Sequence, residues 1–138
     1  MKVYKSKLRK LTGSEYSEVY PKAFAIYRNL KRKTKRRPYI RSAYFNNEKV
    51  FLDYFWEHLH QKVWRDKVRR LKFYQVALDL IENSKAEPTS KQNPNKSSEI
   101  LHRFAGITID QELFFVQIKE NKKTDQKFLL SMFPEDLP

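Results

Sequence analysis

The sequence contains no cysteine, only two glycines and no long apolar run, and each absence excludes a class of protein. Without cysteine the chain forms no disulfide and binds no metal through thiolates. A phosphate-binding glycine loop needs clustered glycines, whereas Gly13 and Gly106 lie far apart. No segment approaches the roughly 18 apolar residues of a membrane span. Disulfide scaffolds, P-loop enzymes and membrane-spanning proteins are therefore excluded.

The overall length and the first residues set further expectations. At 138 residues the chain has the length of a single domain, 1–138. The opening MKVYKSKLRK is basic, and no apolar segment follows it. We therefore expect no secretory signal, no membrane partner and a cytoplasmic location.

Apolar periodicity predicts helices in the first half of the chain. Residues 1–41 are expected to form a basic N-terminal arm and one helix, whose apolar stripe contains Tyr20, Phe24 and Tyr27. Residues 46–83 are expected to form two helices, at about 48–61 and 64–83. The next segment, 84–99, is polar throughout with two prolines and is expected to be a loop.

The last third of the chain, 100–134, is predicted to be a β-sheet. Three runs of β-branched and aromatic residues, 101–109, 113–120 and 127–133, are separated by short polar breaks, as in an antiparallel meander. Alternation places Phe114, Val116 and Ile118 on one face of the middle strand. The predicted fold is therefore α+β, with N-terminal helices packed on a C-terminal antiparallel sheet of three to four strands.

Positive charge is concentrated in the first third of the chain. Residues 1–41 hold 14 Lys or Arg against 2 Asp or Glu, whereas the remainder is nearly balanced. A solvated helix end would explain a short basic run, but this density favours a polyanion as partner. RNA, DNA and an acidic protein remain open. The expected nucleic-acid-binding residues are Lys31, Arg32, Lys33, Lys35, Arg36, Arg37 and, in a later turn, Lys123.

The sequence shows no metal-ligand cluster and no cofactor motif, so any chemistry must use side chains alone. Cleavage of RNA by its own 2′-hydroxyl meets that condition. An imidazole titrates near neutral pH, so His102 is the candidate acid or base, although a histidine on a strand is more often structural. Arg103 and Lys119 are the candidate phosphate cations, and Ser131 is the candidate positioning group.

A resemblance supports this hypothesis. The strands HRFAGIT, LFFVQIKE and FLLSMFP resemble the small phage and mobile-element nucleases grouped with barnase, EndoU, colicin D and RelE. The resemblance covers about residues 84–134. It implies helices packed on an antiparallel sheet and a metal-independent endoribonuclease without cofactor, often a toxin restrained by an antitoxin or immunity protein. His102, Lys119 and Ser131 resemble the histidine, the basic residue and the serine of that group.

Two other functions stay open from the sequence. A noncatalytic RNA- or DNA-binding protein would use the basic N-terminal arm and would not depend on His102. A protein-interaction module would tolerate neutralisation of residues 31–37. The preferred prediction is a toxin-like endoribonuclease with RNA as its partner.

Overall fold

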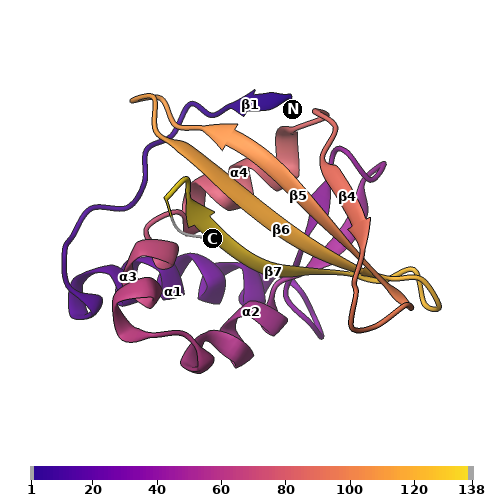
Figure 1. Cartoon of the computed structure of the whole chain (residues 1–138). Coiled ribbons are helices and arrows are strands. Elements are labelled where there is room, and N and C mark those ends of the chain that lie inside the picture. The colour runs from indigo at the N-terminus through magenta and orange to yellow at the C-terminus, as the bar shows by residue number, and fades with distance from the viewer. Residues whose placement is uncertain (1, 137–138) are drawn as a thin grey trace.

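A computed structural model describes residues 2–136, in which a curled β-sheet packs on helices (Figure 1). The elements in chain order are β1 (Val3–Lys5), α1 (Tyr16–Lys33), β2 (Tyr39–Ser42), β3 (Glu48–Phe51), α2 (Asp53–His58), the 3₁₀ turn η1 (Leu59–Gln61), α3 (Trp64–Leu71), α4 (Tyr74–Asn83), β4 (Thr89–Gln92), β5 (Glu99–Ile107), β6 (Leu113–Asn121) and β7 (Lys127–Pro134). No helix within residues 2–136 is long and apolar enough to cross a membrane.

The expected α+β class is confirmed, but the predicted sheet is too small and too regular. The described strands form one sheet of seven in the order β1-β5-β6-β7-β3-β2, and β4 also pairs with β5. The β1–β5 and β3–β7 pairs are parallel, so the sheet is mixed. The extra strands are short, and β4 is exposed along its whole length. Such strands are held by backbone pairing, so their sequences show little alternation of apolar and polar residues.

Two of the expected segments therefore divide differently. The predicted helix over 48–61 begins as strand β3, because Phe51 packs beside Phe128 of β7. Phe51, Phe55 and Leu59 are spaced four residues apart, as apolar residues on one face of a helix are, and this spacing led to the helix prediction. The predicted helix over 64–83 breaks into α3 and α4, where the Lys72 carbonyl accepts a hydrogen bond from the N–H of Leu11. The polar segment 84–99 is not all loop, since it contains β4.

The predicted meander is confirmed as β5, β6 and β7, paired antiparallel. A β-bulge opposite Gln117 and Ile118 inserts Leu130 as an extra residue in β7. Beyond the bulge, side chains of β7 change face relative to a regular strand, so Leu129 and Met132 both enter the core. We call the buried side of the meander the core face; its residues are Phe104, Phe114, Val116, Ile118, Leu129 and Met132.

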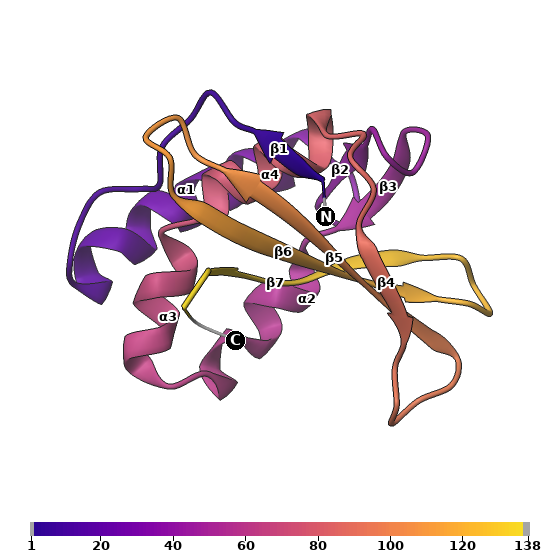
Figure 2. The ribbon, with the colours of Figure 1, turned by 45° about the horizontal axis from the view of Figure 1, so that its top comes forward.

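The opposite side, which we call the open face, carries Arg103, Phe115, Gln117, Lys119 and Phe128 on these three strands. In Figure 1, α4 lies behind β5 and β6, and no helix of the described chain lies in front of them. Gly106 permits the close approach of α4, since a Cβ there would lie 2.9 Å from Leu80. Helices α2 and α3 lie beside β7 instead (Figure 2). The open face thus has no helical cover over β5 and β6, whereas α2 and α3 reach it along β7.

Candidate nucleic-acid interface

Lys and Arg side chains lie over aromatic rings across the open face, and the same pattern continues on β3 and β2. On β2 and β3, the Lys49 ammonium lies 4.6 Å from the centre of the Tyr39 ring. Register extends this side of the sheet from Tyr39 through Phe51 to Phe128. All three rings are partly exposed. Cation–π contacts of this kind hold long basic side chains flat against the sheet.

Lys119 lies at the centre of the open face. Its ammonium is 3.9 Å from the centre of the Tyr54 ring and 3.6 Å from the Glu99 carboxylate. The ring of Phe128, the partner of Lys119 in register, has its centre 5.5 Å from the same ammonium. The Lys119 side chain is only 15% exposed. One carboxylate and two rings therefore hold this ammonium at a fixed position at the surface.

A histidine adjoins this cluster. The His58 ring stacks on Tyr54 with ring centres 4.0 Å apart. His58 Nδ1 lies 2.9 Å from the Tyr54 carbonyl oxygen, which only accepts hydrogen bonds. In neutral His58 the proton therefore sits on Nδ1, and Nε2 carries the free lone pair. This arrangement orients the imidazole on one side of the Tyr54 ring, while the Lys119 ammonium lies over the same ring.

Arg103 occupies the β5 side of the open face. Its guanidinium lies 5.8 Å from the Phe115 ring and 5.5 Å from the Phe133 ring, and the residue is exposed. It borders a cavity of about 150 Å³ lined by Thr89, Lys91, Leu101, Arg103 and Gln117. This cavity adds a second exposed cation, Lys91 on the edge strand β4, to the same side of the sheet.

Ser131 lies on this side of the sheet too, but it is buried. It is 3% exposed, and Arg70 Nη1 donates a 2.6 Å hydrogen bond to its hydroxyl oxygen. Burial lowers the pKa of Arg70, although a guanidinium stays charged near neutral pH. Ser131, predicted as a positioning group, is therefore a buried anchor for Arg70 of α3.

The basic run of residues 31–37 reaches the same surface at its end. Arg37 forms a two-pronged ion pair with Asp53, with nitrogen to oxygen distances of 2.9 and 2.8 Å. Its guanidinium also lies 4.3 Å from the Phe51 ring and 5.3 Å from the Phe128 ring. The hydrogen bond to Asp53 raises the pKa of Arg37. The other cations of the run are exposed: Lys31, Arg32, Lys33, Lys35 and Arg36. Lys123 is exposed in the turn between β6 and β7.

His102 lies on the core face, opposite Arg103, Lys119 and Ser131. It is 8% exposed. Its Nε2 lies 2.8 Å from the Glu120 carboxylate and its Nδ1 lies 2.6 Å from the Ser90 hydroxyl. An ionised carboxylate only accepts, so Nε2 donates to Glu120, and in neutral His102 the Ser90 hydroxyl donates to Nδ1. Both ring nitrogens are engaged, and the ring also packs against Phe45.

The carboxylate that holds His102 belongs to a buried charge network. Lys127, 2% exposed, lies 3.8 Å from Glu120 and 2.9 Å from Glu48. Burial disfavours the charged ammonium, but the hydrogen bond to Glu48 and the nearby carboxylates outweigh it, so the pKa of Lys127 is raised. This network ties β4, β5, β6, β7 and β3 together beneath the sheet edge.

The predicted site residues therefore do not form a single cluster. Arg103 and Lys119 share the open face, Ser131 lies buried on the same side, and His102 is on the other side. Tyr54 and His58 were not among the predicted site residues, although their i, i+4 spacing indicates that they share a helix face. Nor was Arg70, which periodicity places on a solvated helix surface.

Among residues 2–136, no three His, Asp or Glu side chains converge as they do around a metal ion. Searches against protein-family models, curated proteins and solved structures found no match to this chain.

Proposed function

We propose that the open face binds single-stranded RNA and that the protein cleaves the bound strand without a metal ion. One observation carries the proposal: a cation lies on an aromatic ring repeatedly along one side of the sheet, from β2 to β5. Helix α2 contributes the Tyr54 ring, and no helix lies in front of β5 and β6. Unpaired bases stack on such rings, and the cations contact phosphates. The net charge of +13 supports a polyanion as partner.

The proposed cleavage begins with attack of the 2′-oxygen on the adjacent phosphorus. The 2′-hydroxyl gives its proton to His58 Nε2, the new oxygen–phosphorus bond forms a pentavalent phosphorane, and the 5′-oxygen departs. The departing oxygen takes a proton from solvent water, and the product ends in a 2′,3′-cyclic phosphate. Lys119 and Arg103 supply charge to the phosphorane.

Several contacts support this assignment. Lys119 is held between Tyr54, Phe128 and Glu99, so its charge is positioned before RNA binds. His58 stacks on Tyr54, the ring that lies under Lys119. The resemblance of the three meander strands to metal-independent nucleases points to the same reaction.

A noncatalytic RNA-binding protein is the second candidate function. The placement of His102 favours it, because the histidine expected to act as acid or base is buried and has a partner on each ring nitrogen. This candidate retains the open face as the binding surface and assigns no reaction to it.

Incubation of the purified chain with structured and unstructured RNA in EDTA distinguishes the two candidates. We expect fragments with 2′,3′-cyclic phosphate ends, which the Arg103→Ala/Lys119→Ala variant does not produce. Expression of the chain should also arrest cell growth, and the same variant should relieve the arrest. Intact RNA that still binds the protein would overturn the cleavage half of the proposal and leave the binding half standing.

A further inference from the structure

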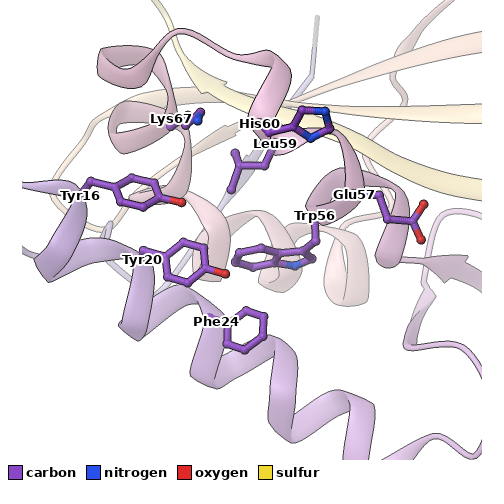
Figure 3. Close-up of a pocket in the computed structure, with 8 residues that line it drawn as sticks. All are labelled: Tyr16, Tyr20, Phe24, Trp56, Glu57, Leu59, His60 and Lys67. Carbon is purple, nitrogen blue, oxygen red and sulfur yellow. The ribbon is translucent and has the colours of Figure 1, made fainter.

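A pocket lined by aromatic rings lies between helix α1 and the segment formed by α2, η1 and α3. We call it the ring pocket; its lining residues are Tyr16, Tyr20, Phe24, Trp56, Glu57, Leu59, His60 and Lys67 (Figure 3). Its volume is about 390 Å³. Small-molecule sites commonly measure about 300–1,000 Å³ and combine apolar walls with a few polar groups. The ring pocket has both properties.

Three rings form a fixed wall of the pocket. Tyr20 stacks on Phe24 with ring centres 5.5 Å apart, and Trp56 meets both edge-on at 5.7 and 5.4 Å. The Trp56 indole N–H donates a 3.2 Å hydrogen bond to the buried hydroxyl of Tyr74. Trp56 is therefore oriented by the core, while it and the other rings of the wall remain partly exposed. This arrangement leaves ring surface available to a planar group.

Two hydroxyl groups enter the pocket from α1. Figure 3 shows the side chains of Tyr16 and Tyr20 directed toward the space beside Trp56 and Leu59. Burial, followed by the neighbouring Tyr20, raises the pKa of Tyr16, so this phenol stays protonated near neutral pH. Between residues 2 and 136 no side chain accepts a hydrogen bond from either hydroxyl. Both are available to the polar edge of a ligand.

The charged groups at the pocket suit a ligand with one anionic group. Lys67 and His60 line one side, Glu57 lines another, and the Arg28 guanidinium lies 5.3 Å from the Phe24 ring. A purely cationic ligand would meet Lys67 and Arg28. A nucleotide fits this set: its base stacks on a ring, its N–H groups donate to Glu57 or a phenol, and its phosphate contacts Lys67.

We propose that the ring pocket receives one nucleotide of the RNA strand bound on the open face. This inference rests on the proposed function. Helix α2 connects the two sites, because Tyr54 lies under Lys119 on the open face whereas Trp56 lines the ring pocket. A helix with its side chains is about 10–12 Å in diameter, so an extended strand of a few nucleotides can pass over α2 from one site to the other. The pocket thus selects a base that has left the stack.

Fluorescence of Trp56 reports on the pocket directly. The chain has two tryptophans, and Trp64 is 54% exposed outside the pocket, so a Trp64→Phe background isolates the Trp56 signal. The titrants are 5′-AMP, 5′-UMP, the matching nucleosides and a short single-stranded RNA. The pocket variants are Tyr20→Leu, Tyr16→Phe and Lys67→Ala. The matched control is Tyr44→Leu, which removes a partly exposed ring in the turn between β2 and β3, outside both sites.

We expect saturable quenching by mononucleotides that weakens at least about tenfold in Tyr20→Leu and stays unchanged in Tyr44→Leu. Lys67→Ala should weaken the binding of 5′-AMP and 5′-UMP several-fold and leave the binding of the nucleosides unchanged. Tyr16→Phe, which removes only a hydroxyl, keeps the test valid if Tyr20→Leu unfolds. Quenching that is insensitive to all three pocket variants overturns the inference. If the protein binds RNA but mononucleotides do not quench Trp56, the pocket inference is overturned and the proposed function still stands. Mononucleotide quenching without binding of the short RNA supports a nucleotide site and removes the proposed function.

Discussion

The Lys119 ammonium lies 3.9 Å from the centre of the Tyr54 ring and joins the middle strand of the meander to helix α2. These residues are 65 positions apart in the sequence. Glu99 and Phe128 complete the setting of this cation. The contact places a fixed positive charge where the uncovered sheet meets a helix, and the following predictions depend on that position.

Replacing Lys119 with Ala should weaken RNA binding and cleavage together. Loss of one phosphate contact should reduce the salt dependence of binding by about 0.7 in the log–log slope for a single strand. Loss of a preorganised charge should lower cleavage about 10²- to 10³-fold. Lys85, which is exposed beside the turn between β2 and β3, provides the control. Equal effects of Lys119→Ala and Lys85→Ala would contradict the assignment.

His58 and His102 should behave in opposite ways. His58→Gln is expected to lower cleavage by about 10²- to 10⁴-fold with little change in stability, because it removes a proton-transfer group at the surface. His102→Ala is expected to retain cleavage but to lower the free energy of unfolding by about 1–3 kcal/mol, because Ser90 and Glu120 lose a buried partner. Denaturant unfolding and product analysis measure both effects. Loss of cleavage in a folded His102→Ala protein would restore His102 as the catalytic residue.

Arg36 and Arg37 are adjacent in the sequence but should have different roles. Arg37→Ala should cost about 1 kcal/mol of stability, because it breaks a partly exposed ion pair with Asp53 and the contact with Phe51. Arg36→Ala should leave stability unchanged and weaken RNA binding through lost charge. Thermal unfolding and RNA titration of both variants measure this difference. Equal stability of the two variants would show that the Arg37 contacts contribute nothing measurable.

The contact of β1 with α4 predicts a loss of stability at high pH. Burial, and then the hydrogen bond that Tyr4 donates to Asp79, raise the pKa of Tyr4 to about 12 from 10.0. Between these values the unfolded chain ionises Tyr4 while the folded protein keeps the proton, so stability falls as pH rises. Tyr4→Phe should be less stable near neutral pH and should lose stability less steeply above pH 10. Parallel pH profiles of the two proteins would contradict this origin.

The sequence predicted the meander well because its three strands alternate and are separated by polar breaks. It also predicted the faces of β6 correctly, with Phe114 inward and Lys119 outward. Strands β1, β2, β3 and β4 escaped prediction because such short strands depend on backbone pairing with distant partners. The face of each candidate residue on β7 depended on a bulge at Leu130, which no local pattern reveals.

Part of the candidate site also could not be predicted from the sequence. Arg103 and Lys119 were found from residue type and strand position. Tyr54 and His58 were overlooked because α2 was predicted as part of a longer helix with a buried apolar face. The separation of His102 from Arg103 follows from strand alternation, since adjacent residues on a strand face opposite sides. The contact of Lys119 with Tyr54 required the tertiary fold.

The affinity for single-stranded RNA, measured at about 50 and 200 mM salt, tests the open face most directly. The variants are Arg103→Ala/Lys119→Ala and the control Lys22→Ala/Lys85→Ala, which removes two exposed cations elsewhere. Both lose the same net charge, so long-range attraction changes equally. We expect the open-face variant to lose at least about tenfold more affinity than the control variant. Its log–log dependence of affinity on salt should have a slope shallower by about 1.4. Equal losses in affinity and slope would contradict RNA binding at the open face.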